Sequence, residues 1–203
     1  MSSIAIIGGT GYAGGHIART AAARGHDVTI VSRSAGEGVV QGSISDPAFL
    51  KQLAADHDHV VVATQPDGLL EALPDLLEAS RSGKARLSFV GGAGSLDVAP
   101  GGPKLIDTPE FPEEYKEVAR AHSNVLDALR ADDRGADWFY VSPAAVFGAW
   151  AEGSETGTYR SSDDVLLTDD AGSSAIGGAD YAAAYVDEIE NRRHVNKRFH
   201  VAN

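Results

Sequence analysis

Five glycines fall within eight residues directly after the first apolar stretch of the chain. From Ile4 the sequence reads IAIIGGTGYAGG, which contains G-x-G-x-x-G through Gly9, Gly11 and Gly14, and G-x-x-G-x-x-G through Gly8, Gly11 and Gly14. A turn of this kind lets backbone N–H groups approach a pyrophosphate at the positive end of a helix, where a side chain would obstruct the contact. The chemistry that these glycines predict is therefore the binding of a dinucleotide.

The context of the glycines decides between this interpretation and a purely structural turn, because a glycine motif alone is weak evidence. The apolar run 3–7 reads as a strand, the Ala-rich segment 16–24 reads as a helix closed by Gly25, and residues 27–31 form a β-branched strand. Together they make a strand–helix–strand unit of about 30 residues, which is the setting that dinucleotide binding requires. We therefore expect a dinucleotide site rather than a structural turn.

The end of the second expected strand indicates which dinucleotide is bound. An acidic residue there would bind the adenosine ribose 2′-hydroxyl of NAD, but the chain has Ser32, Arg33 and Ser34. A guanidinium between two hydroxyls suits a 2′-phosphate, to which it can donate paired charge-assisted hydrogen bonds. We favour NADP(H), with NAD(H) as the remaining possibility and an ordinary solvated arginine as the structural alternative.

Strand and helix patterns alternate through the first two thirds of the chain. Further strands are expected at 38–43, 59–63, 86–90 and 138–141, and helices at 47–55, 69–81 and 113–132. Such alternation predicts an α/β fold with a doubly wound parallel sheet. The Pro/Gly-rich segment 99–112 is expected to be a loop over the carboxyl edge of that sheet.

The pattern weakens after Pro143. Residues 159–160 and 165–167 could form a hairpin, 179–190 a helix and 198–201 a last strand. These pieces are too short for an independent domain, so residues 1–203 are expected to form one domain. Segments 93–113 and 144–178 are then expected to line a small substrate pocket.

Composition excludes several classes of protein. The 203 residues carry a net charge of −12, which opposes binding to nucleic acid or to an anionic membrane, and no apolar run approaches the roughly 18 residues of a membrane span. There is no cysteine, hence no disulfide, thiolate metal site or cysteine nucleophile, and the histidines lack ligand spacing, so no metal site is predicted. No secretory signal is recognised, and a cytoplasmic location is expected.

Several segments taken together resemble one family. The segments IAIIGGTGYAGG, VSRS, FVGGAGSL, DTPEFPEEYKEVARAHSNVLDAL and WFYVSPAAVF are similar to the atypical short-chain dehydrogenases/reductases of the NAD(P)H-binding or NADH-flavin reductase group, and more distantly to biliverdin reductase B and NmrA-like proteins. The resemblance covers nearly the whole chain and is far more specific than the glycine motif.

The resemblance implies a Rossmann fold and a set of cofactor contacts, each carried over by motif position. Phosphates would lie on Gly8, Thr10, Gly11, Tyr12, Ala13 and Gly14; the 2′-phosphate near Ser32, Arg33 and Ser34; adenine near Gly42, Ser43 and Ile44; the middle of the cofactor along Ala63, Thr64 and Gln65; the nicotinamide ribose at Gly91, Gly92 and Ala93; and the nicotinamide near Pro143 and Ala144.

The chain departs from the broader short-chain dehydrogenase pattern, whose Tyr-x-x-x-Lys pair protonates a substrate carbonyl. No tyrosine here has a lysine four residues later. A flavin acceptor relaxes this requirement, because its electron-poor ring can take a hydride while solvent supplies the proton. Candidate polar groups near the transfer are Ser95, Tyr115, His122 and Ser142. Each also has a structural alternative, such as ordering a loop or packing on the sheet.

Two functions remain open on the sequence. The favoured one is an NADPH-preferring reductase that transfers hydride to a flavin, quinone or similar conjugated acceptor, with flavin as substrate rather than as tightly bound cofactor. It would act on a small molecule as a monomer or homodimer, without nucleic acid or membrane partners. The alternative is a non-catalytic NADP(H) sensor of the NmrA type, which shares the fold and acts through partner proteins.

Overall fold

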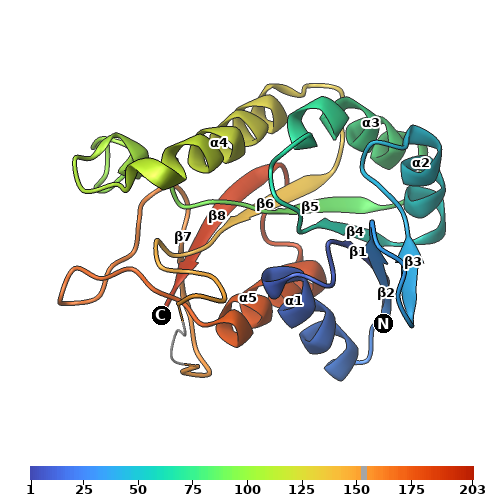
Figure 1. Cartoon of the computed structure of the whole chain (residues 1–203), viewed down its shortest axis with the longest axis horizontal. Helices are drawn as coiled ribbons and strands as arrows, with labels where there is room; N and C mark the ends of the chain where they lie inside the picture. The colour runs from blue at the N-terminus through green and yellow to red at the C-terminus, as the bar shows by residue number, and fades with distance from the viewer. Residues whose placement is uncertain (152–154) are drawn as a thin grey trace.

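One mostly parallel sheet organises the chain, and its strand order reverses beside β1. The computed structural model describes residues 1–151 and 155–203, and the strands follow the order β3-β2-β1-β4-β5-β6-β8-β7 (Figure 1). The chain runs from β1 outward to β3 and then returns to place β4 on the other side of β1, which creates a switch point between β1 and β4. The predicted doubly wound α/β fold is confirmed. The strands are β1 (Ser3–Ile7), β2 (Asp27–Ser32), β3 (Val39–Gln41), β4 (His59–Val62), β5 (Arg86–Val90), β6 (Trp138–Ser142), β7 (Arg160–Ser162) and β8 (Lys197–Ala202).

Helices cover both faces of the sheet. Figure 1 shows α2, α3 and α4 on one face and α1 and α5 on the other. Strand β6 illustrates the resulting two cores, because Trp138 and Tyr140 pack into the first while Phe139 and Val141 pack into the second. The helices are α1 (Tyr12–Ala23), α2 (Pro47–Asp56), α3 (Leu69–Ser82), α4 (Lys116–Ala131) and α5 (Gly178–Asn191), with short 3-10 helices η1 (Leu105–Asp107) and η2 (Glu113–Tyr115). None of the described helices combines the length and apolar character needed to cross a membrane.

Local chemistry explains where two of the helices begin. Asp46 caps α2 by accepting hydrogen bonds from the N–H groups of Ala48 and Phe49, and Pro47 occupies the first helical position, as the sequence indicates. Helix α1 starts at Tyr12, whereas the sequence predicted a start at residue 16. The glycines at 14 and 15 are therefore part of the helix, because the turn leads into it without a linker.

The region after β6 differs from the prediction. The expected hairpin between 159–160 and 165–167 is wrong, because β7 pairs antiparallel with β8 instead. Val165 forms a parallel bridge with Asp97, and the N–H of Leu166 donates to the Asp97 carbonyl. Residues 164–166 therefore lie against the loop that follows β5. The predicted pocket segment 144–178 includes residues 152–154, which lie outside the described part of the chain.

Candidate functional site

The glycine turn brings the backbones of β1, β4 and α1 into direct contact. Gly8 has φ +84°, and a Cβ at that position would lie 2.4 Å from the Ala63 carbonyl oxygen at the end of β4. A Cβ on Gly14, in the first turn of α1, would lie 2.3 Å from the Gly8 carbonyl oxygen. Only glycine permits these approaches. The turn thus places the start of α1 at the switch point between β1 and β4.

The N-terminus of α1 is available to bind an anion. Gly11 is the N-cap and supplies no side-chain hydrogen bond, and the N–H of Gly15 is the donor to the Gly11 carbonyl at 2.8 Å. The N–H groups of Tyr12, Ala13 and Gly14 belong to the first turn, where helix geometry offers no intrahelical acceptor. Their partial positive charge suits a phosphate.

Arg33 extends from the end of β2, the neighbour of β1. Its carbonyl accepts from Gln41 Nε2 at 3.0 Å, and the Oγ of Ser32 accepts from the N–H of Ser34 at 3.3 Å, so the turn around it is fixed. The Arg33 side chain is exposed and forms no salt bridge with any residue that the structure describes. Its guanidinium is therefore available to an anionic ligand.

The predicted adenine contacts lie in the turn between β3 and α2. A Cβ on Gly42 would lie 2.3 Å from the Phe49 ring, so packing alone requires a glycine there. Ser43 Oγ accepts from the N–H of Ser45, and Ile44 packs against the buried core. Each of these residues has a structural role, and their contact with adenine stays a prediction.

Thr64 follows β4 and supplies an unpaired polar group beside the glycine turn. Its Oγ1 is buried and has no hydrogen-bond partner within the described chain. The adjacent N–H of Ala63 donates to the Ile7 carbonyl at 2.8 Å, which holds the segment 63–65 against β1. A buried hydroxyl without a partner is costly, so it points to a group that binds there. The glycine turn, the uncapped α1, Arg33 and Thr64 together fit a dinucleotide with an extra phosphate.

Tyr140 ties the loop after β5 to helix α4. Its hydroxyl donates to the His122 carbonyl at 3.2 Å and accepts from the N–H of Gly92 at 3.3 Å. A Cβ on Gly91 would lie 2.0 Å from the Tyr140 ring, so Gly91 is required by this contact. The predicted nicotinamide-ribose segment 91–93 is thereby held against α4.

His122, on α4, lies beside the carboxyl end of β5. A Cβ on Gly92 would lie 3.3 Å from His122 Cδ2, and the Nδ1 of His122 is buried without a partner among the described residues. Burial lowers the pKa of His122 to about 4. The imidazole is therefore neutral at pH 7. It can donate or accept a hydrogen bond, but it is not in the imidazolium form that would act as a general acid.

Ser95 and Ser142 are brought together by Arg198, which the sequence analysis did not identify. Arg198 Nη1 donates to Ser95 Oγ at 2.9 Å and to Ser142 Oγ at 3.5 Å, and its side chain is fully buried on β8. Arg198 Nε also donates to Asp164 at 2.8 Å, and Arg130 Nη2 donates to the same carboxylate at 2.6 Å. This arginine fixes the loop after β5 and the segment around Asp164 onto the sheet.

His200 lies on the same strand and adds a second buried polar group. Its Nδ1 contacts the Ser142 carbonyl at 3.1 Å, and its Nε2 is buried without a described partner. Burial is the main reason that its pKa falls to about 4, and the nearby charge of Arg198 lowers it further. The signal in the sequence was the alternation RFHVA, which puts Arg198 and His200 on one face of a strand whose other buried residues, Phe199, Val201 and Ala202, are apolar.

The remaining predicted residues have different surroundings. Tyr115 is exposed and stacks on Trp150. Ala144 is buried in the core on the α1 and α5 face. Its side chain therefore packs in that core, unlike the neighbouring Pro143, which is not part of this cluster. The structure thus joins Ser95 with Ser142, places His122 beside Gly92, and pairs Tyr115 with Trp150.

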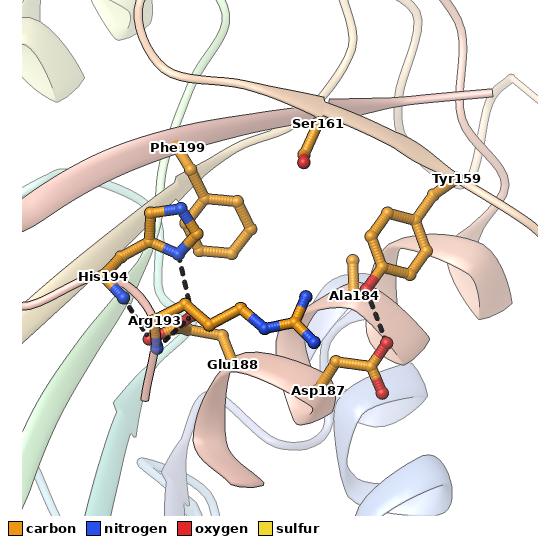
Figure 2. Close-up of a pocket in the computed structure, with 8 residues that line it drawn as sticks. All are labelled: Tyr159, Ser161, Ala184, Asp187, Glu188, Arg193, His194 and Phe199. Carbon is orange, nitrogen blue, oxygen red and sulfur yellow. Dashed lines mark hydrogen bonds and ion pairs between the residues drawn. The ribbon is translucent and has the colours of Figure 1, made fainter. Parts of the chain in front are cut away.

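Two cavities lie elsewhere. One, of about 30 Å³, lies between α5 and the strands β7 and β8, and has roughly the volume of one water molecule. Figure 2 shows the Arg193 side chain extending across it, between the Tyr159–Asp187 and His194–Glu188 pairs. The other, of about 430 Å³, is a groove between α3 and the C-terminal half of α4. Neither contains a predicted site residue. Within residues 1–151 and 155–203 no three His, Asp or Glu side chains are placed to hold a metal ion.

Comparisons with known proteins give the family and the fold. The sequence matches the family described as NAD(P)H-binding over residues 8–192. It is 38% identical to YwnB of Bacillus subtilis, a protein named as uncharacterized, over 98% of this chain and 97% of that one. A crystal structure from Streptococcus pneumoniae TIGR4, described as a "putative NADH-flavin reductase", has a TM-score of 0.89 with 32% identity and covers 100% of both chains. A "putative exported protein" from Burkholderia pseudomallei has a TM-score of 0.89 with 37% identity over 100% of both chains. A "putative epimerase" from Bacteroides thetaiotaomicron has a TM-score of 0.85 with 30% identity, covering 98% of this chain and 96% of that one.

Proposed function

The chain belongs to the NAD(P)H-binding family, and from this premise we propose that it is an NADPH-preferring reductase of a flavin, quinone or similar conjugated acceptor. The observation that carries the proposal is the uncapped N-terminus of α1 at the switch point, with the free guanidinium of Arg33 at the end of the adjacent strand. The first feature suits a pyrophosphate and the second an additional phosphate. The Streptococcus pneumoniae relative supports a flavin-type acceptor by its description.

In this proposal, different residues bind different parts of the cofactor. The N–H groups of Tyr12, Ala13 and Gly14 would hold the pyrophosphate, and Arg33 with its flanking serines would hold the 2′-phosphate. The buried hydroxyl of Thr64 would bind the middle of the cofactor, which would satisfy an atom that otherwise lacks a partner. The segment 91–93 and the backbone of Pro143 would border the nicotinamide end, and Gly42, Ser43 and Ile44 would border the adenine.

A bound nicotinamide cofactor would supply the hydride, and the protein's part would be to hold the acceptor ring against the nicotinamide and to exclude water. His122 is suited to this part because its neutral imidazole lies beside Gly92 and can orient an acceptor by a hydrogen bond. Ser95 and Ser142 serve a different purpose in this proposal. Their contacts with Arg198 hold the loop after β5 in place, so they are positioning residues rather than groups that touch the acceptor.

The proposal includes the setting in which the enzyme works. We place it in the cytoplasm as a monomer or homodimer whose partners are small molecules. The net charge of −12 supports only the expectation that nucleic acid and membranes are not partners, because it opposes association with nucleic acid and with anionic lipid. Size-exclusion chromatography with light scattering would give the oligomeric state.

The direct test is oxidation of NADPH by the purified protein, followed at the nicotinamide absorbance, with FMN, riboflavin and a panel of quinones as acceptors. NADH serves as the competing donor and Arg33→Ala as the diagnostic variant. Turnover that prefers NADPH, with the preference lost in the variant, would support the reductase and the role of Arg33. Tight binding of NADPH without turnover on any acceptor would instead favour a sensor of the NmrA type.

A further inference from the structure

Two aromatic rings from separate segments are stacked on one another at the surface. Tyr115 ends η2, Trp150 lies in the loop after β6, and their ring centroids are 6.3 Å apart with an interplanar angle of 13°. Tyr115 is 47% exposed and Trp150 is 66% exposed, the highest value for a large apolar side chain apart from Met1 among the described residues. Side chains of this size are usually buried or used for binding, so an exposed pair needs an explanation.

The backbone around Trp150 is shaped to hold the indole where it lies. Gly148 has φ +151°, and a Cβ there would lie 2.6 Å from Trp150 Nε1. The N–H of Ala151 donates to the Gly148 carbonyl at 3.0 Å and closes a tight turn that contains Trp150. On the other side, the N–H of Tyr115 donates to the Pro112 carbonyl at 3.1 Å. The backbone that carries each ring is therefore held by a local hydrogen bond.

Both rings belong to segments that leave the sheet at its carboxyl edge, where the proposed cofactor site lies. Helix α4 begins directly after Tyr115 and carries His122, two turns further on, to its contact with Gly92. The loop that holds Trp150 begins at Pro143, directly after β6, which pairs with β5. The pair thus lies on the two segments expected to flank an acceptor.

We propose that Tyr115 and Trp150 form an aromatic clamp that binds the planar conjugated ring of the acceptor, an inference that rests on the proposed reductase function. Stacked carbon atoms approach to about 3.5 Å, so a third ring between two parallel rings requires a separation of about 7 Å. The two rings are already nearly parallel, with their centroids 6.3 Å apart, and the segments that carry them must part until the ring planes are about 7 Å from each other before a third ring lies between them. The ligand that two nearly parallel, electron-rich faces would bind is a flat, electron-poor ring such as isoalloxazine or a quinone.

The chain contains a second tryptophan, Trp138, which is buried, so a Trp138→Phe background makes Trp150 the sole tryptophan reporter. We would titrate this protein with riboflavin, first without cofactor and then with NADP⁺, and follow the fluorescence of Trp150. Saturable quenching is expected, and in Tyr115→Ala the dissociation constant should rise about 3- to 10-fold because one stacking face is lost. Tyr115→Phe should restore it.

Trp150→Ala and Trp150→Phe are compared in the protein that retains Trp138, with the anisotropy of riboflavin as the readout, which also covers the case in which Trp138→Phe does not fold. The first variant should weaken riboflavin binding about 3- to 10-fold and the second should largely restore it. Leu70→Ala, an exposed apolar residue on α3, is the control and should leave binding unchanged. Competition by menadione, a quinone without the ribityl chain of riboflavin, would test whether the conjugated ring alone is sufficient for binding to the two aromatic side chains.

The outcomes separate this inference from the proposed function. Riboflavin binding that depends on both rings, without turnover, supports the clamp and contradicts the reductase. Turnover with the riboflavin KM and dissociation constant unaffected by Tyr115→Ala and Trp150→Ala supports the reductase and overturns the clamp. A change of oligomeric state in Trp150→Ala with unchanged riboflavin binding also overturns it, because the ring pair would then be a contact between two copies of the chain.

Discussion

Gly14 lies so close to Gly8 that a Cβ on Gly14 would be 2.3 Å from the Gly8 carbonyl oxygen. This contact sets how closely α1 packs on the end of β1, and therefore where the N–H groups of the first helical turn lie. Gly8 is itself held by Ala63, since a Cβ on Gly8 would be 2.4 Å from the Ala63 carbonyl oxygen. The position of the proposed phosphate site thus depends on backbone contacts alone.

The substitution Gly14→Ala should weaken NADPH binding and destabilise the fold together. The neighbour is backbone and cannot move aside without shifting α1 from β1, so a loss of about 1–3 kcal/mol is expected, as for other overpacked sites. Gly15→Ala is the matched control, because its Cβ would meet the mobile end of Arg19 at 3.4 Å. Alanine in a helix is about 1 kcal/mol better than glycine, so this variant should keep or gain stability. Urea unfolding and NADPH titration of both variants would check this, and equal effects would contradict it.

Arg33→Ala should reduce the affinity for NADPH about 10- to 100-fold and leave the affinity for NADH nearly unchanged. A hydrogen bond to a charged group contributes about 1.5–3 kcal/mol, and only NADPH carries the 2′-phosphate that would accept it. Isothermal titration with both cofactors measures the difference. Lys51→Ala, an exposed cation on α2, controls for general loss of positive charge. A parallel loss of affinity for both cofactors would place Arg33 outside the phosphate site.

The sequence predicted most of the fold because its signals are local. The alternation of apolar strands with helices, and the Asp46–Pro47 start of α2, are readable from neighbouring residues. The strand β7 could not be predicted in this way, because it pairs with β8 across about 40 residues of chain. The expected hairpin used the same residues with a local partner and was therefore wrong.

The parts of the candidate site that are formed by backbone could be predicted from the sequence. The glycine turn and the end of β2 follow directly from the motif, whereas the partners of Ser95 and Ser142 depend on Arg198, more than 50 residues away in the sequence. The stacking of Trp150 on Tyr115 likewise depends on how two distant loops meet. Contacts of this kind need the tertiary structure, because no spacing rule connects the residues.

Arg198→Met should destabilise the protein by about 1–3 kcal/mol. The fully buried guanidinium would be lost, which leaves the hydroxyls of Ser95 and Ser142 without this donor, whereas the half-exposed Asp164 keeps Arg130. Arg130→Met removes the other cation from the same carboxylate and is the matched comparison. Its side chain is 40% exposed, so a cost below about 1 kcal/mol is expected. Chemical unfolding of the two variants would measure the contrast, and similar losses would mean that burial of Arg198 contributes little.

Three histidines with lowered pKa values should make the protein less stable in mildly acidic solution. Burial lowers the pKa of His59 to about 3, and it is the main cause that lowers the pKa values of His122 and His200 to about 4. In the unfolded chain each group titrates near about 6.5. The unfolded state therefore binds more protons below that pH, so stability is fully present above about pH 6.5 and is lost as the pH falls toward 4.

The expected loss is large enough to measure well before general acid unfolding. Each histidine contributes a slope of up to about 1.4 kcal/mol per pH unit, so the free energy of unfolding should fall by at least about 2 kcal/mol between pH 6.5 and pH 5. Urea unfolding at several pH values gives the slope. His200→Gln removes one of the three titrating imidazoles, the one whose Nε2 is buried without a described partner. The slope of the free energy of unfolding against pH should then fall by about a third. This holds even if the substitution lowers stability at pH 7. A stability that stays constant from pH 7 to pH 5 would show that these imidazoles take up protons in the folded state, and hence that the site around His122 and His200 is open to water.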